Sequence, residues 1–419
     1  MTKTVQTSET RLRAVGIALA LAIVLVPAVV ATGPVQAQTF TVLYSFTGGA
    51  DGGYPYDGLI QDASGNLYGT TYQGGTYGYG TVFMVDQTGK ETVLYSFAGA
   101  GGDGANPYAG LVQDASGELY GTTYGGGASG YGTVFMVDQT GKETVLYSFT
   151  GSGGDGANPY AGLLQDASGN LYGTTYYGGH GGAGCRHRKP TGCGTVFELD
   201  TTGKETVLYA FPGTGLHGAN PYAGLIQDTK GNLWGTTVYG GRGCPHRKPP
   251  GCDSGTVFKV DKTGKETVVH TFPGTGNDGA FPYAGLLLDA TGNLWGTTVG
   301  AGGWSDGVVF EMTKSGKELQ VWNPWGQYGT NPYAGLVQDA AGNLYGTNAG
   351  GGAYGYGVVF TIYTNCSWEC YAVLHSFAGA PSDGATPYAG LVWDAKGNLY
   401  GTTYAGGAYG YGVVFELTP

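Results

Sequence analysis

The sequence predicts an all-β fold, a seven-bladed β-propeller of four-stranded antiparallel blades, and three observations support this prediction. First, a Pro-Tyr-x-Gly-Leu segment recurs seven times, at spacings of 52, 52, 62, 61, 50 and 55 residues. Its prolines are Pro55, Pro107, Pro159, Pro221, Pro282, Pro332 and Pro387. Second, each repeat has four short runs of β-branched and aromatic residues between turn residues, as a four-stranded blade requires. Third, the two ends of the chain hold complementary parts of one repeat.

The repeat that begins at Pro107 shows the four expected strands. They are the segments 110–114, 119–124, 133–138 and 144–149. The first two strands of a repeat are joined by Asp-x-x-Gly-Asn or a close variant, and the last two by Asp-x-Thr-Gly-Lys-Glu. In both segments the aspartate can accept backbone hydrogen bonds and the glycine can adopt positive φ. These acidic loops are therefore interpreted as hairpin turns in preference to calcium sites.

The ends of the chain indicate how the ring closes. An extra strand of the fourth type is expected at 39–46, whereas the last repeat stops after its third strand at Leu417. Pairing the two would let the N-terminal strand complete the last blade and remove exposed sheet edges. The expected blades are 55–97, 107–149, 159–211, 221–272, 282–322, 332–377, and 387–417 completed by 39–46.

Residues 1–37 differ from all that follows and predict a signal peptide. Two arginines precede an apolar run over 14–31, and residues 35–37 place small side chains where a signal peptidase reads. Cleavage there would leave a propeller domain at 38–419. It would also remove three basic residues and one acidic residue, which moves the net charge from −11 to −13. The alternative is a retained membrane anchor, because about 20 apolar residues span a bilayer.

Composition and charge exclude several classes of protein. The chain has 419 residues with 84 glycines, 33 tyrosines and only 12% charged residues, which favours a glycine-rich folded β protein over a disordered chain. The acidic balance disfavours nucleic-acid binding. Six cysteines in an exported chain favour disulfide bonds. The expected pairs are Cys185–Cys193, Cys244–Cys252 and Cys366–Cys370.

Three recurring blocks carry a family resemblance. They are Gly-Asn-Leu-Tyr-Gly-Thr-Thr, Tyr-Gly-Thr-Val-Phe and Val-Leu-Tyr-Ser-Phe. With them, residues 39–419 resemble the GloVer-type (Gloeo/Verruco) tandem repeat family of exported bacterial β-propeller-like proteins. The resemblance implies a secreted or surface-anchored array of undetermined function, in the periplasm, on the cell surface or outside the cell. A weaker likeness to kelch propellers supports the geometry only.

The repeats differ mainly in loops that should share one face of the ring. In an up-and-down blade, the loops between the second and third strands (2–3 loops) lie with the blade crossings, opposite the tight hairpins, and variable loops on a rigid scaffold commonly carry binding sites. The 2–3 loops of the third and fourth blades contain inserts that read Cys-x-His-Arg-Lys-Pro-x-Gly-Cys. Their candidate ligand-binding residues are Arg186, His187, Arg188, Lys189, Arg242, His246, Arg247 and Lys248.

Three interpretations of these inserts compete. The disulfides brace the loops and the cations keep them soluble, or the cations of an otherwise acidic protein bind an anionic ligand such as a phosphate, a carboxylated sugar or an acidic polymer. The third interpretation is a zinc site, which an exported setting disfavours. The brace is slightly favoured over anion binding, and we expect no cofactor and no resident metal.

Tyrosines mark the same face of the ring. They stand in the 2–3 loops at Tyr79, Tyr131, Tyr356 and Tyr411, and also directly after each repeat proline. Rings of aromatic side chains suit stacking on sugars. For the Pro-Tyr copies, which occur in every repeat, packing between blades near the axis is the favoured interpretation.

The expected function is a monomeric binding or interaction scaffold, with an acidic glycan, another anionic ligand or a cell-surface partner. Nearly all polar residues recur in every repeat, whereas a catalytic site needs one irregular constellation. No catalytic residue is therefore assigned, and an enzyme is less favoured than a binding protein. The alternatives are a lyase or lactonase-like propeller that uses His217 and the insert histidines, and a purely structural surface protein.

Overall fold

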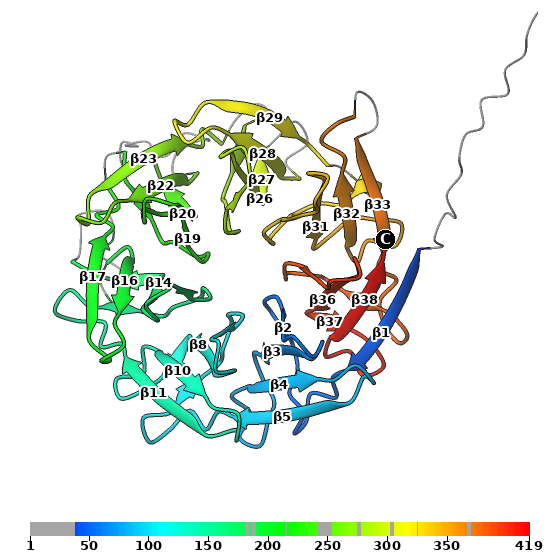
Figure 1. The fold of residues 1–419 in the computed structure, drawn as a ribbon, viewed down its shortest axis with the longest axis horizontal. Coiled ribbons are helices and arrows are strands. Elements are labelled where there is room, and N and C mark those ends of the chain that lie inside the picture. The colour runs from blue at the N-terminus through cyan, green and yellow to red at the C-terminus, as the bar shows by residue number, and fades with distance from the viewer. Residues whose placement is uncertain are drawn as a thin grey trace, which may run out of the picture. The chain divides into compact units, whose positions relative to one another are not determined.

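The computed structural model describes most of the unit Gln38–Pro419. The described residues are 38–180, 185, 190, 192–214, 216–241, 254–274, 278–301, 306–324, 326–366 and 370–419. The predicted signal peptide lies outside them. Seven four-stranded antiparallel sheets stand around one axis as the blades of a propeller (Figure 1). The predicted fold class is therefore confirmed.

Each blade runs outward from a short innermost strand. Blade 1 is β2 (Ile60–Gln61), β3 (Leu67–Thr71), β4 (Thr81–Val85) and β5 (Glu91–Ser96); blade 2 is β7 (Val112–Gln113), β8 (Leu119–Thr123), β10 (Thr133–Val137) and β11 (Glu143–Ser148). Blade 3 is β13 (Leu164–Gln165), β14 (Leu171–Thr175), β16 (Thr195–Leu199) and β17 (Glu205–Ala210); blade 4 is β19 (Ile226–Gln227), β20 (Leu233–Thr237), β22 (Thr256–Val260) and β23 (Glu266–Thr271). Blade 5 is β25 (Leu287–Leu288), β26 (Leu294–Thr298), β28 (Val308–Met312) and β29 (Glu318–Trp322); blade 6 is β30 (Val337–Gln338), β31 (Leu344–Asn348), β32 (Val358–Ile362) and β33 (Tyr371–Ser376).

Blade 7 is built from both ends of the chain. Its strands are β35 (Val392–Trp393), β36 (Leu399–Thr403), β38 (Val413–Thr418) and β1 (Thr39–Ser45). β1 pairs antiparallel with β38, so that Thr39 faces Thr418 and Ser45 faces Val413. The blue first strand accordingly lies beside the red last strand in Figure 1. The predicted closure by the N-terminal strand is confirmed.

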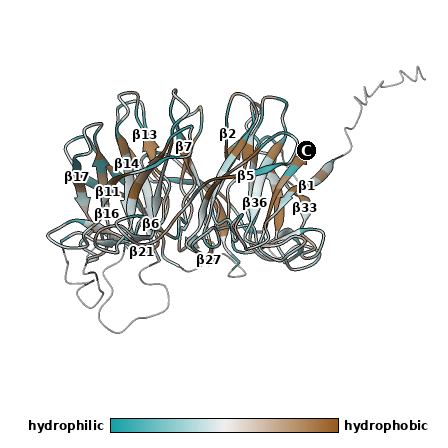
Figure 2. Cartoon of the chain, turned by 90° about the horizontal axis from the view of Figure 1, so that it is seen from below, coloured by the Kyte–Doolittle hydropathy of each residue, from teal (hydrophilic) through white to brown (hydrophobic). Residues whose placement is uncertain are grey.

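Short extra pairings tie the variable loops together. They are β6 (Gly104–Ala105) with β9 (Gly125–Gly126), β12 (Gly156–Ala157) with β15 (Tyr177–Gly178), β18 (Gly218–Ala219) with β21 (Tyr239–Gly240), β24 (Gly279–Ala280) with β27 (Gly300–Ala301), and β34 (Gly384–Ala385) with β37 (Ala405–Gly406). In blades 1 and 6 a single bridge replaces this pairing, between Gly53 and Gln73 and between Thr330 and Gly350, respectively. The short 3₁₀ helix η1 (Gly326–Tyr328) precedes blade 6. Each pairing joins a blade crossing to the 2–3 loop of the next blade. Figure 2 shows β6, β21 and β27 at one end of the ring, here called the loop face.

The innermost strands are shorter than the sequence predicts. The segment expected as 110–114 forms a strand only at Val112–Gln113, because its first residues approach the neighbouring blade. A Cβ on Gly110 would come within 3.0 Å of the Gly58 carbonyl oxygen of blade 1. Residues at the axis therefore pack against the next blade instead of extending their own sheet.

Buried threonines link neighbouring blades through hydrogen bonds. Thr70 Oγ1 donates to the Ala109 carbonyl at 2.8 Å, and Thr122 Oγ1 donates to the Ala161 carbonyl at 2.9 Å. The equivalent bonds come from Thr174, Thr236, Thr297, Thr347 and Thr402. The last of them ends on the Asp57 carbonyl and so joins blade 7 to blade 1. The ring is thus closed by side chains as well as by β1.

The acidic hairpin loops are held by their aspartates. Asp62 Oδ1 accepts hydrogen bonds from the N–H groups of Ser64 and Asn66, both at 2.9 Å. Asp86 Oδ1 accepts them from Thr88 and Lys90, at 2.8 and 3.0 Å. These are the contacts of turn caps, as the sequence interpretation requires.

Candidate functional site

All eight candidate residues of the basic inserts lie outside the described residues. The same holds for the expected Cys244–Cys252 pair. The roots of the first insert are described, since Cys185 and Cys193 form the predicted disulfide. Cys366 and Cys370 form the other predicted pair, in a hairpin of blade 6.

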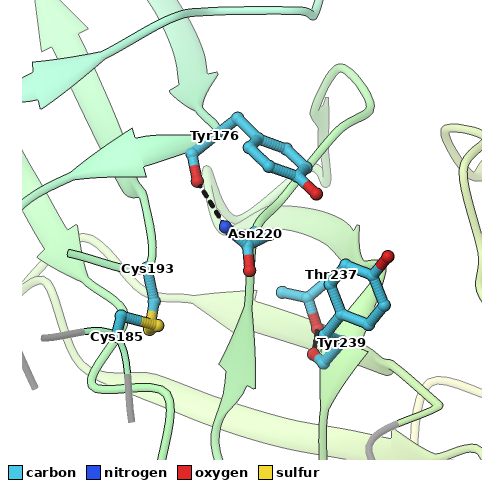
Figure 3. The surroundings of a disulfide bond; sticks show 6 residues. All are labelled: Tyr176, Cys185, Cys193, Asn220, Thr237 and Tyr239. Atoms are coloured by element: carbon cyan, nitrogen blue, oxygen red, sulfur yellow. Dashed lines mark hydrogen bonds between the residues drawn. A yellow bond between two sulfur atoms is a disulfide. The ribbon is translucent and has the colours of Figure 1, made fainter. Parts of the chain in front are cut away.

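The Cys185–Cys193 disulfide anchors its loop in the core between blades 3 and 4. Both cysteines are buried and belong to one apolar cluster with Phe211 and Leu225. The Cys193 carbonyl accepts the N–H of Asn220 at 2.6 Å, and Asn220 Nδ2 donates to the Tyr176 carbonyl at 2.8 Å (Figure 3). The backbone at Cys193, one end of the disulfide, is therefore hydrogen-bonded to the crossing that leads into blade 4.

We expect the double change Cys185→Ser and Cys193→Ser to lower the free energy of unfolding by about 2.5 kcal/mol, the chain-entropy value for so short a loop. Urea denaturation under non-reducing conditions measures the change. The pair Cys366→Ser and Cys370→Ser, which closes a shorter loop, is the control and should cost about 2 kcal/mol. An unchanged midpoint for the first variant would contradict the bracing role.

The predicted loop tyrosines have structural roles. A Cβ on Gly99 would meet the Tyr79 ring at 2.8 Å, so this ring lies directly on the crossing into blade 2. The Tyr79 carbonyl also accepts the N–H of Asn106 at 2.8 Å. Tyr131, Tyr356 and Tyr411 accept the same kind of bond from Asn158, Thr386 and Tyr54, respectively. These four tyrosines hold the loops in place.

Sequence reasoning missed a second set of loop tyrosines. Tyr77, Tyr354 and Tyr409 stand two residues before Tyr79, Tyr356 and Tyr411 and are 60%, 63% and 61% exposed. They occupy equivalent 2–3 loops of blades 1, 6 and 7, which are neighbours around the closed ring. We call these three side chains the tyrosine arc. The Tyr-Gly-Tyr sequence shared by the three loops was the signal that could have revealed it.

The tyrosines that follow the repeat prolines form a closed ring at the axis. The axial tyrosine ring consists of Tyr56, Tyr108, Tyr160, Tyr222, Tyr283, Tyr333 and Tyr388. Each ring contacts the next, with centroid distances from 4.6 to 5.2 Å. Tyr222 Oη also donates a hydrogen bond to Tyr56 Oη at 3.1 Å, between blades 4 and 1. These tyrosines pack at the axis, which is the favoured sequence interpretation.

The axial tyrosine ring lines a cavity of about 280 Å³ that holds one carboxyl group. This group is Asp57, whose Oδ1 and Oδ2 accept the N–H groups of Gly58 and Gly110 at 2.7 and 2.8 Å. Burial raises the pKa of Asp57, although the two N–H bonds oppose the shift. The other six repeats have alanine at this position: Ala109, Ala161, Ala223, Ala284, Ala334 and Ala389. Comparing the variable position of the seven Pro-Tyr-x-Gly-Leu segments would have identified Asp57 from sequence.

Carboxyl pairs lie near the outer rim where blades meet. Tyr44 Oη donates to Asp51 at 2.9 Å, and the negative charge of Asp51 also acts on Glu91, the first residue of β5. Burial, followed by the neighbouring aspartate, raises the pKa of Glu91, Glu143 and Glu205 to about 7. One oxygen of each glutamate is buried without a hydrogen-bond partner. Glu91, Glu143 and Glu205, each beside an aspartate of a blade crossing (the rim pairs Asp51–Glu91, Asp103–Glu143 and Asp155–Glu205), are therefore expected to bind a proton near neutral pH.

At two other blade junctions, a histidine replaces the aspartate or the tyrosine of the rim sites. His217 stands where other crossings have aspartate, and its Nδ1 lies 2.9 Å from Glu266. His375 replaces the usual tyrosine, stacks on Phe40 at 3.7 Å between ring centroids, and contacts Asp383 at 3.0 Å. Within the described ranges, no three or more His, Cys, Asp or Glu side chains are placed to hold a metal ion.

The seven closed blades, the axial tyrosine ring and the variable loops on one face define the class as a β-propeller repeat protein. Residues 29–186 and 247–419 match the Gloeobacter/Verrucomicrobia repeat. Since the match covers more than half of the sequence, the chain belongs to that family. In the part of the chain that the structure describes, no helix is long and apolar enough to cross a membrane.

Solved structures that are similar to this chain include two described as lactonases, one of them as putative. A putative 6-phosphogluconolactonase from Bacteroides uniformis is 15% identical with a TM-score of 0.50, over 82% of this chain and 89% of that one. A gluconolactonase from Xanthomonas campestris is 13% identical with a TM-score of 0.42, over 91% and 89%. At these identities the likeness concerns the fold alone. No curated protein matches the sequence.

Proposed function

We propose that this protein is an exported carbohydrate-binding scaffold and that the tyrosine arc contacts a polysaccharide on the loop face. The observation that carries the proposal is the exposure of Tyr77, Tyr354 and Tyr409, each about three-fifths exposed at the same place in three adjacent blades. Single exposed aromatic residues need no explanation, but a repeated set at equivalent positions presents sugar-sized apolar surfaces in a series.

The loops that carry the tyrosine arc are held firmly at their bases. Tyr79, Tyr356 and Tyr411 pack on the glycines Gly99, Gly379 and Gly48 of the adjoining crossings, and short backbone bridges fix the loop roots. The exposed tyrosines are therefore presented on ordered loops, and binding would order few side chains. That arrangement lowers the entropic cost of binding a flexible polymer.

The basic inserts belong to 2–3 loops of the same kind, in blades 3 and 4. Six cations there, Arg186, Arg188, Lys189, Arg242, Arg247 and Lys248, would favour a polysaccharide that bears carboxylate or sulfate groups. Export is supported by the two described disulfides, since such bonds persist in oxidising compartments.

A polysaccharide array followed by calorimetry tests the tyrosine arc. We expect the triple change of Tyr77, Tyr354 and Tyr409 to Ala to weaken binding about tenfold or more, because each lost ring contact contributes about 0.5–1.5 kcal/mol. Tyr363→Ala is the matched control, since this tyrosine is 42% exposed but follows β32 in a hairpin on the opposite face. Equal binding by the triple variant and the control would reject the proposal.

Removing positive charge from the inserts tests their role separately from that of the tyrosine arc. If they contact an acidic polysaccharide, changing Arg186, Arg188, Arg242 and Arg247 to Ala should weaken binding and reduce its dependence on salt. Unchanged affinity for acidic polymers would reject the inserts while leaving the tyrosine arc as the site.

A further inference from the structure

The cavity lined by the axial tyrosine ring contains one carboxyl group, Asp57. Among the described residues that line the cavity, Asp57 alone carries a formal charge, and the others are tyrosines, alanines, glycines and aliphatic residues. No described Lys, Arg or His forms an ion pair with it, and its carboxylate oxygens accept hydrogen bonds from the N–H groups of Gly58 and Gly110. A carboxylate in such surroundings is destabilised unless it binds a proton or a cation.

The carboxyl group is not required by the fold. The other six blades have alanine at the same position and make the same innermost strand and inter-blade threonine hydrogen bond. Within the Pro-Tyr-x-Gly-Leu segment, blade 1 therefore departs from the other six repeats at this one position, which lies at the axis where the blades meet. A single irregular polar group in a cavity at the centre of a symmetric scaffold is typical of a ligand site.

The walls of the cavity favour an organic cation over an anion or a metal ion. Tyrosine rings attract cations through the negative face of their π system, and several such rings beside a carboxylate suit methylated ammonium groups. Calcium takes six to eight oxygen ligands, whereas this cavity supplies a single carboxylate. An anion would meet the negative charge of Asp57. The volume of about 280 Å³ restricts the ligand to a small molecule or to one end of a larger one.

We propose that the axial cavity binds a small organic ammonium cation, with the Asp57 carboxylate as counter-ion and the axial tyrosine ring as the surrounding surface. This site is distinct from the tyrosine arc, so either proposal can fail without the other. The axial tyrosines are the titratable groups that face Asp57, and burial keeps their pKa above its usual value, so they stay neutral. Binding should strengthen as pH rises, because the cation displaces the proton that Asp57 holds at low pH.

Calorimetry and NMR with tetramethylammonium and choline test the site. We expect saturable binding that Asp57→Asn and Asp57→Ala both weaken at least tenfold, since neither keeps the charge. Asp57→Ala should fold normally, because it restores the residue of the other six repeats. The neutral analogue 3,3-dimethylbutanol should bind more weakly than choline, which separates charge from shape.

Glu143→Gln is the control, because it removes a carboxyl group at the rim and leaves the cavity unchanged. It should bind choline as the unchanged protein does. The proposal is overturned if Asp57→Ala binds tetramethylammonium equally well, if the neutral analogue binds as tightly, or if none of the probes binds. Preferential binding of calcium or potassium would overturn it in favour of an inorganic ion.

Discussion

Phe46→Ala should lower the free energy of unfolding by about 3–5 kcal/mol and release the closing strand β1. Phe46 directly follows β1, is fully buried, and contacts Phe83 of blade 1 with a centroid distance of 5.0 Å. Its N–H also donates to the Gly412 carbonyl at 3.0 Å. Phe46 also belongs to one buried cluster with Val414 of β38, so a cavity here weakens the packing of β1 on β38, the one pair of neighbouring strands in a blade that the chain does not join directly.

Phe97→Ala is the matched control, because Phe97 makes the same contact with Phe135 at 5.0 Å inside the continuous chain. Both variants should lose similar stability in urea. Only Phe46→Ala should accelerate hydrogen exchange at the amides of Phe40 and Val42, which belong to the β1–β38 pairing. If both variants leave these amides equally protected, closure does not depend on Phe46.

The protein should become more stable to heat as the pH is lowered from 8 to about 5.5. Glu91, Glu143 and Glu205 have a pKa of about 7 in the folded protein, against an ordinary value of 4.5. At pH values between 4.5 and about 7, these glutamates hold protons in the folded chain that they have released in the unfolded chain. The stability that this binding provides is complete below about pH 4.5 and is lost as the pH rises through about 7. Thermal unfolding followed by circular dichroism across this range measures it.

Changing the three glutamates to Gln tests whether they cause the pH dependence of stability. Glutamine stays neutral, so the triple variant should be more stable than the unchanged protein at pH 8 and should lose most of the pH dependence. Glu266→Gln should have a smaller effect, since His217 opposes the upward shift in the pKa of Glu266 that burial causes. A slope that persists in the triple variant would assign the effect to other groups.

Stability should fall again in strong acid because of the turn aspartates. Although burial opposes ionisation, hydrogen bonds from Asn232 and Trp234 lower the pKa of Asp228 to about 2. A lowered pKa contributes stability above the ordinary value of 3.8, and that contribution disappears as the pH falls through about 2. The pH of maximum stability is therefore expected between about 4 and 5.5.

Much of the architecture was predictable because the strand and turn patterns of a blade are complete within each repeat. The Pro-Tyr-x-Gly-Leu segments, the capped turns and the split last repeat led to seven closed blades, which the structure confirms. The Cys185–Cys193 and Cys366–Cys370 pairs followed from short spacing alone. The extra loop pairings and the short innermost strands were not predicted, because both arise from contacts between segments that the local pattern does not relate.

The candidate site was predicted only in part. The inserts were recognised because they lengthen two of the repeats, and four of the loop tyrosines were recognised because they stand in the variable 2–3 loops. The tyrosine arc was missed, since exposure distinguishes Tyr77 from Tyr79 although the sequence treats them alike. Asp57 was missed because the seven Pro-Tyr-x-Gly-Leu segments were compared for what they share and not for the position at which one of them differs.

The sequence by itself determined the blade count and the strand order, because these follow from hydrophobic and turn patterns that repeat about every 50 residues, and it determined the closure because its two ends hold complementary parts of one repeat. The tertiary structure decided which charges meet. The charge of Asp51, in the crossing that leads into blade 1, acts on Glu91 of β5, and Asp57 shares one cavity with tyrosines contributed by all seven blades. A closed ring places residues that are distant in the chain around common spaces, and burial in those spaces changes their charge and their capacity to bind.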